Sequence, residues 1–179
     1  MNIELEKKLA EKYPFMRRGK GLEEQQREGF IYDLYGAFGC DVDDGWYELL
    51  DSLCGEIVTA YGEAGVPVDI VIDQVKQKCG GLRFYYHREP ESMAPDTNET
   101  TESLSASSCG ELSALDERLM DIVSKWEDKA ETTCEKCGEP GIMRVAGYIR
   151  TLCDACYFLE EEWKREHWNR RRMPKNYRE

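Results

Sequence analysis

Two pairs of cysteines near the C-terminus carry the most specific chemical signal in this chain. Cys134 and Cys137 form one C-x2-C pair, and Cys153 and Cys156 form a second pair after fifteen intervening residues. A tight turn directs both sulfurs of such a pair to one side, so two pairs complete a tetrahedron around one Zn²⁺ ion. The spacing therefore predicts a zinc site. An iron–sulfur cluster also uses four cysteines, but the hairpin-length spacing suits zinc better.

The expected zinc is structural, because four thiolates leave no coordination position for water or a substrate. A nucleobase deaminase would need H-x-E or C-x-E ahead of a P-C-x-x-C pair, and neither pair here follows a proline. Some zinc modules with two C-x2-C pairs carry a nuclease site. Such a site would need a catalytic histidine between the pairs, and residues 138–152 contain none. His167 comes late in the next predicted helix and is expected to be an ordinary helix-end residue. The sequence therefore predicts no enzyme.

A second candidate site lies in the stretch CGGLRFYYHR, where aromatic and basic residues alternate. Arg83, Tyr85, His87 and Arg88 would suit stacking and charge contacts with a small nucleotide ligand. The alternative is an ordinary strand that buries Leu82, Phe84 and Tyr86 in the core and leaves Arg83, Tyr85 and His87 outside. The alternation favours the ordinary strand.

The C-terminal tail is the third candidate site. Residues 164–179 carry seven bases against two acids, whereas the remaining chain carries a net charge of −17. Arg170, Arg171, Arg172 and Lys175 are therefore candidate contacts for nucleic acid or for an acidic partner. The acidic body of this protein is an equally suitable partner for the tail. The same acidic body repels phosphates and favours basic protein surfaces or simple solubility.

Four further cysteines share no ligand spacing. Cys54 falls on the apolar face of a predicted helix and Cys79 precedes a predicted turn, so both are expected as buried small hydrophobic residues. Cys40 and Cys109 have no assigned role. A second metal site built from distant residues stays open as an alternative.

The elements that must position these groups indicate an α+β fold. Apolar residues at helical spacing predict helices over 3–13, 45–61 and 110–130, and a further helix after Cys153. Alternation predicts strands over 66–72 and 82–87 that meet at a Gly80–Gly81 turn, with DQVKQK a strand in preference to a short helix. A short hairpin over 143–151 and the following helix complete a treble-clef-like order of knuckle, hairpin and helix.

These elements predict four regions. Residues 1–87 form an α+β module, 88–108 a flexible acidic linker, 109–131 a connecting helix, and 132–179 a zinc-binding module with a basic tail. The linker prediction follows from a stretch rich in Pro, Ser, Thr and Glu that offers little apolar surface to bury. No apolar run reaches the length that spans a bilayer and no signal segment is recognisable, so no membrane association and a cytoplasmic location are expected.

Several ordered motifs resemble those of small uncharacterised proteins of bacteriophages and prophages. The motifs are Trp46 with LLDSLC, then QVKQKCGGLRFYY, CEKCGEPG and TLCDAC, and the resemblance covers most of 45–87 and 132–158. It implies a phage accessory protein in the host cytoplasm, one that interferes with host defence. On this basis the expected function is non-enzymatic binding of a host protein or sequestration of a nucleotide signal. A nucleic-acid-associated regulator that works through the basic tail is the alternative.

Overall fold

The fold is seen in a computed structural model, which describes residues 1–89, 106–145 and 147–172, apart from the side chains of 106–113 and 168–172. Its α-helices are α1 (Ile3–Lys12), α2 (Leu22–Arg27), α3 (Leu34–Phe38), α4 (Tyr47–Ala64), α5 (Ala106–Ala130) and α6 (Asp154–Arg172). Its strands are β1 (Cys40–Asp41), β2 (Ile70–Lys78), β3 (Gly81–Arg88), β4 (Ile142–Arg144) and β5 (Arg150–Leu152). There are two 3₁₀ turns: η1 (Pro14–Met16) follows α1, and η2 (Asp44–Trp46) leads directly into α4. The predicted α+β class is confirmed.

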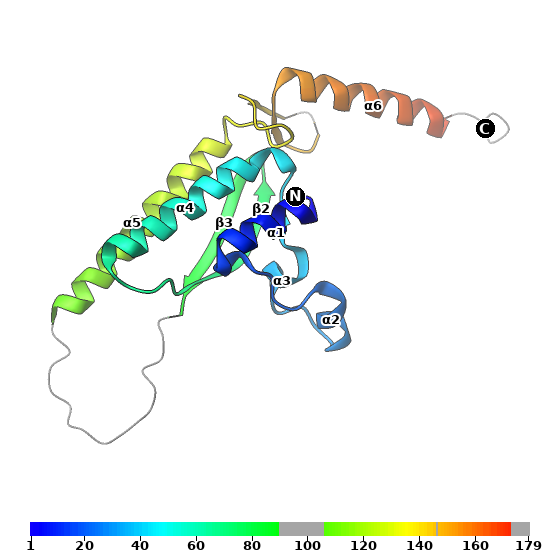
Figure 1. Cartoon of the computed structure of the whole chain (residues 1–179). Helices are drawn as coiled ribbons and strands as arrows, with labels where there is room; N and C mark the ends of the chain where they lie inside the picture. Colours follow the sequence, from blue (N-terminus) through cyan, green and yellow to red (C-terminus); the bar gives the residue numbers. More distant parts are fainter. Residues whose placement is uncertain (90–105, 146, 173–179) are drawn as a thin grey trace.

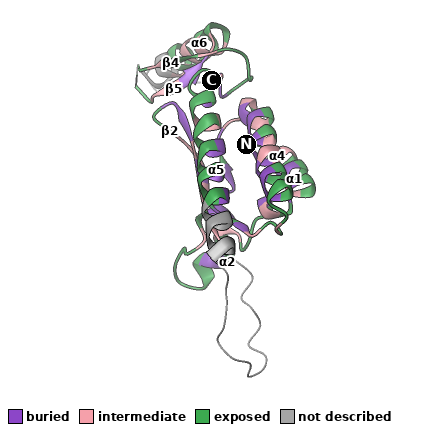
Figure 2. Cartoon of the chain, turned by 90° about the vertical axis from the view of Figure 1, so that its left-hand side faces the viewer, coloured by how far each residue is buried: buried purple, intermediate pink, exposed green. Residues whose placement is uncertain are grey.

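The core lies between α4, α5 and one face of the sheet β1-β2-β3 (Figures 1 and 2). Helix α4 buries the apolar stripe that its sequence predicts, with Leu50, Leu53 and Ile57 fully enclosed. Helix α5 adds Leu115 and Leu119 to the same core cluster. The helix expected as a connector therefore forms one wall of the core, and it begins three residues before the predicted start of that region.

The β2–β3 hairpin turns one residue earlier than expected. Lys78 pairs with Gly81, so the two-residue loop is Cys79–Gly80 and not Gly80–Gly81. Both loop residues have positive φ, +52° and +81°, as a type I′ turn requires. The stretch DQVKQK is a strand, as favoured, and its pairing carries an irregularity between Ile72 and Gln74.

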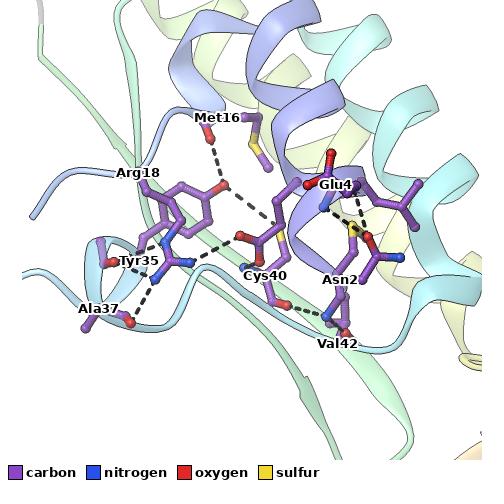
Figure 3. Close-up of polar contacts among 12 residues, drawn as sticks. Asn2, Glu4, Met16, Arg18, Tyr35, Ala37, Cys40 and Val42 are labelled. Carbon is purple, nitrogen blue, oxygen red and sulfur yellow. Dashed lines mark hydrogen bonds and ion pairs between the residues drawn. The ribbon is translucent and has the colours of Figure 1, made fainter. Parts of the chain in front are cut away.

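The N-terminal segment is fastened to the sheet by a buried carboxylate (Figure 3). Glu6 is only 8% exposed, and it accepts hydrogen bonds from Cys40 N (2.8 Å) and Arg18 Nη1 (3.3 Å). The Arg18 guanidinium also donates to the carbonyls of Gly36 and Ala37, each at 2.9 Å. Arg18 lies in the loop between η1 and α2, and these contacts make it part of the scaffold.

The C-terminal part begins at the end of α5 and carries the hairpin β4–β5 followed by α6. Helix α6 projects away from the body (Figure 1). The knuckle, hairpin and helix occur in the predicted treble-clef order. Most of the predicted 88–108 linker lies outside the described residues, although Arg88 ends β3 and 106–108 begin α5. Among the described helices, none is long and apolar enough to cross a membrane.

Candidate metal centre

The four predicted ligands converge on one point. The Sγ atoms of Cys134, Cys137, Cys153 and Cys156 all lie within 4.8 Å of one another, and the Cys137–Cys153 pair is 3.6 Å apart. A Zn–S bond of about 2.3 Å implies tetrahedral S···S edges of about 3.8 Å. The residues present therefore fit a metal ion that four thiolates bind.

Local backbone geometry explains why each pair points inward. The first pair closes a turn in which Gly138, at φ +80°, donates its N–H to Cys134 O at 2.9 Å. The second pair straddles the start of α6, where the N–H of Cys156 reaches Cys153 Sγ at 3.4 Å. This backbone N–H lowers the pKa of the Cys153 thiol to about 7. The start of α6 thus favours a thiolate at the site.

A cluster of charged side chains lies beside the metal centre. The Arg150 guanidinium contacts the carboxylates of Glu135, Glu160 and Asp43, which come from three separate segments. Glu135 lies between the two cysteines of the first pair and is 2% exposed. Burial raises its pKa, and the Arg150 contact opposes that rise. Because Oε2 of Glu135 has no partner, the ion pair with Arg150 is the main stabilisation of this buried charge.

The turn that carries the first cysteine pair, residues 134–138, is called here the knuckle. It contacts the N-terminal body directly at Gly45 and Trp46. A Cβ on Gly45 would lie 2.4 Å from Cys137 N, 2.5 Å from Gly138 N and 2.6 Å from Cys134 O. The N–H of Gly45 donates to Glu135 O at 2.9 Å, and the indole of Trp46 donates to Thr133 O at 2.8 Å. Only a glycine permits this approach of two backbones.

A second contact joins the β4–β5 hairpin to the β2–β3 turn. The hydroxyl of Thr151 donates to Gly80 O at 2.7 Å, and Gln77 Nε2 donates to Ile149 O at 2.6 Å. Tyr148 in turn donates its hydroxyl to Gln77 Oε1 at 2.6 Å. The metal centre and the N-terminal body, which are separate regions in the sequence-based prediction, therefore share an interface of direct hydrogen bonds.

The predicted nucleotide-binding residues do not form one cluster. Arg88 is held by Asp69 (2.8 Å) and Asp116 (2.7 Å), and its side chain is 13% exposed. By strand alternation it faces the opposite side of the sheet from Arg83, Tyr85 and His87.

The other three predicted residues share a face but have partners there. Arg83 lies 3.8 Å from Glu127, and Lys76 Nζ lies 5.5 Å from the ring of Tyr85. The imidazole of His87 lies between Asp73 at 2.9 Å and Glu89 at 3.6 Å. His87 also lines an open cleft of about 620 Å³ together with residues of the N-terminal segment, among them Arg17 and Tyr32.

The tail residues are only partly described. Arg170, Arg171 and Arg172 lie in the last turn of α6, but their side chains, like all of Lys175, lie outside the described residues.

The other cysteines divide into two kinds. Cys40 and Cys54 are buried, and burial raises the pKa of Cys40 to about 12 and that of Cys54 well above its ordinary value. The prediction that Cys54 is a buried hydrophobic residue is confirmed. The same prediction for Cys79 is wrong, because Cys79 is exposed in the tip of the hairpin turn, where a side chain cannot reach the core. The side chain of Cys109 lies outside the described residues.

Sequence reasoning missed the residues that fix the metal centre to the body. The sequence places Gly45 and Trp46 at the start of a predicted helix, with Trp46 also in a motif of the phage-protein resemblance, and it assigns no role to Arg150 or Glu135. The one available signal was the placement of a Glu inside the first C-x2-C pair and an Arg three residues before the second.

Comparison with protein-family models, curated proteins and solved structures gives no match. The fold and the site define an α+β protein with a four-cysteine centre that could hold a metal ion.

Proposed function

We propose that this chain is a non-enzymatic binding protein in which a structural zinc ion organises a protein-docking surface. Zinc is the metal that a closed set of four thiolates at this spacing suits best. Since the protein supplies all four ligands, the ion's role is to hold the knuckle, the hairpin and the start of α6 together.

The observation that carries this proposal is an apolar surface on the β4–β5 hairpin, called here the hairpin face. It is centred on Val145 and Tyr148 near the tip of the hairpin, which are 72% and 71% exposed. Ile142 and Met143, 59% and 44% exposed, extend it along β4 on opposite sides of the hairpin. Several large apolar side chains exposed on one short element are typical of an interaction site. The hydrogen bonds of Thr151 and Ile149 to the β2–β3 turn hold this face in place before binding, which lowers the entropic cost of association.

A protein is the partner class that this surface suits. Aliphatic side chains prevail on the hairpin face, whereas single-stranded nucleic acid is bound by aromatic platforms within basic grooves. The net charge of −12 also repels phosphates and favours a partner with a basic surface. The resemblance to phage proteins makes a host protein, such as a component of host defence, the proposed partner.

The nucleotide-binding form has less support. Arg88 is committed to two carboxylates, and His87 lies between two more. A phosphate in this region would meet those acids as well as the bases. The alternative of nucleic-acid binding through the basic tail is an outcome that the following experiment also detects.

The test compares capture by three immobilised full-length proteins: wild type, Val145→Glu and Val68→Glu. Val68 is 43% exposed at a distant place in the sequence, so Val68→Glu is a matched control for an added surface charge. We expect wild type and Val68→Glu to retain the same host protein and Val145→Glu to lose it, with equal zinc content in all three. The retained protein is then purified and titrated against each variant. Equal affinity for wild type and Val145→Glu, or retention of nucleic acid alone, would overturn the proposal.

A further inference from the structure

A groove lies between helix α6 and the β4–β5 hairpin, and it is called here the α6 groove. It has a volume of about 520 Å³ and is lined by Tyr148 of the hairpin and by Leu159 and Trp163 of α6. Lys136 and Lys164 line it as well. Leu159 and Trp163 are four residues apart, so both lie on the side of α6 that faces the groove. The volume falls within the range of small-ligand sites, about 300–1,000 Å³.

Two exposed aromatic rings offer stacking surfaces in the α6 groove. Tyr148 and Trp163 are 71% and 59% exposed. The Trp163 ring stacks on His167 with the ring centroids 3.9 Å apart, and His167 Nδ1 donates to Trp163 O at 2.9 Å. The Tyr148 hydroxyl donates to Gln77, which fixes the outer end of this ring. Because both rings are held in place before binding, a ligand that stacks on them costs little side-chain entropy.

The inner end of the groove carries little uncompensated charge. Glu160 also lines it, but its side chain is 14% exposed and contacts both Arg150 and Lys136, so its charge is neutralised within the chain. The Lys164 side chain is 53% exposed and lies 2.9 Å from Glu161. An exposed pair of this kind is weak, and its lysine can contact another anion at little cost.

The outer end of the groove leads onto the basic half of α6. Residues 164–172 contain five bases and one acid, and positions 167, 170 and 171 follow Trp163 at spacings that share its side of the helix. These nine residues lie about 15–27 Å from the start of a helix that projects from the body (Figure 1). The Debye length at physiological salt is about 8 Å. The acidic body therefore repels an anion at this end of the helix only weakly.

We propose that the α6 groove binds single-stranded nucleic acid. An unpaired base stacks on Trp163 beside Tyr148, and the adjoining phosphates follow the basic half of α6 from Lys164 onward. Aromatic rings joined to a positively charged path are the general means of binding single strands. The bases of a duplex are paired and stacked on one another, so they cannot reach these rings. An acidic protein segment would suit the bases of α6 but would leave the two rings unused.

The test measures binding of labelled oligodeoxythymidine and oligouridine, each of about 12 nucleotides, to full-length, zinc-loaded protein by fluorescence anisotropy in about 50 mM salt. We expect at least one of them to bind, and a duplex of the same length to bind at least about tenfold more weakly. Trp163→Ala should weaken binding of the single strand roughly tenfold, and Trp163→Phe should retain most of the affinity, because it keeps a ring. Phe158→Ala is the matched control. Phe158 is 62% exposed but lies about 140° around α6 from Trp163, so its removal should leave the affinity unchanged.

Salt dependence separates the phosphate contacts from stacking. Each contact with a phosphate of a single strand contributes about −0.7 to the slope of log K against log salt concentration. Lys164→Gln should therefore make the slope shallower by about 0.7, whereas Trp163→Ala should lower the affinity and leave the slope unchanged. Lys8→Gln, at an exposed lysine of α1, is the matched control for a lost charge and should change neither quantity.

Four results would overturn the proposal. Neither oligonucleotide binds at about 100 µM protein, or the duplex binds as tightly as the single strand. Trp163→Ala leaves the affinity unchanged, or an oligoglutamate of equal length binds as tightly, which would assign the groove to an acidic protein segment. If Trp163→Ala has a lower zinc content than wild type, Tyr148→Ala makes the same test from the other wall of the groove. Because the readout is an oligonucleotide, this proposal and the protein partner of the hairpin face can each fail without the other.

Discussion

Replacing Gly45 with alanine tests whether the metal centre and the N-terminal body form one cooperative unit. The added Cβ would meet three backbone atoms of the knuckle at 2.4–2.6 Å, and backbone atoms cannot rotate out of the way. The φ of Gly45 lies outside the left-handed region, so the cost is steric and does not come from an unfavourable backbone conformation. The knuckle, or the η2 turn that carries Gly45, must move.

The expected cost follows from two contributions. Overpacking a close-packed site costs about 1–3 kcal/mol. The movement also weakens the bond from Gly45 N to Glu135 O and the bond from Trp46 to Thr133 O, and one hydrogen bond contributes about 1 kcal/mol. We therefore expect Gly45→Ala to lower the free energy of unfolding by about 2–4 kcal/mol. We also expect weaker metal binding, because the displaced backbone belongs to Cys134 and Cys137.

Urea denaturation followed by circular dichroism measures the first effect, and competition with a chromophoric chelator measures the second. Gly62→Ala is the control, since Gly62 lies within α4 and a Cβ there meets nothing within 4 Å. It should raise the free energy of unfolding by about 0.5–1 kcal/mol through helix propensity and leave metal affinity unchanged. If Gly45→Ala matches wild type in both assays, the knuckle does not depend on the body and the reasoning is refuted.

Three further predictions follow from the same contacts. Removal of the metal by a strong chelator should reduce the helical circular dichroism signal and the unfolding midpoint together, and an unchanged spectrum would contradict a structural ion. Arg88→Met should lower the free energy of unfolding by about 2–4 kcal/mol, because it leaves the Asp69 carboxylate, 10% exposed, without its cationic partner and with only the Tyr61 hydroxyl as a side-chain donor; an effect below about 1 kcal/mol in urea denaturation would show that the ion pair is dispensable. The hydrogen bond to Asp73 raises the pKa of His87, so its small stabilising contribution should be complete below pH 6.5 and disappear as pH rises through the folded-state pKa. His87→Gln should flatten that part of the curve of unfolding free energy against pH, and an identical curve would exclude the contribution.

The sequence was most informative where the determining interactions are local. The four ligands followed from spacing alone, because one turn fixes the direction of both sulfurs in a C-x2-C pair. The buried stripe of α4 followed from helical periodicity. The one-residue error at the β2–β3 turn is also local, since both Cys79–Gly80 and Gly80–Gly81 offered a glycine and only the pairing of Lys78 with Gly81 decides between them.

Contacts between distant segments could not be predicted in this way. Arg150 has partners at positions 43, 135 and 160, and no periodicity relates these positions. The approach of Gly45 to Cys137 joins residues more than ninety apart in the chain. The role of α5 was missed for a similar reason, because helical periodicity reveals an apolar face but not the surface that covers it.

These long-range contacts change what a bound ion would do. In an isolated zinc module the free energy of metal binding stabilises that module alone. Here the knuckle shares hydrogen bonds with η2 and the hairpin shares them with β2–β3, so ordering the knuckle also orders its partners in the body. Thermodynamic linkage makes this effect reciprocal, because a body that loses its fit to the knuckle must bind the metal more weakly by the same free energy. Residues 161–167, the part of α6 beyond Glu160 whose side chains are described, bond only within the helix, so within one chain a bound ion would stabilise chiefly the start of α6.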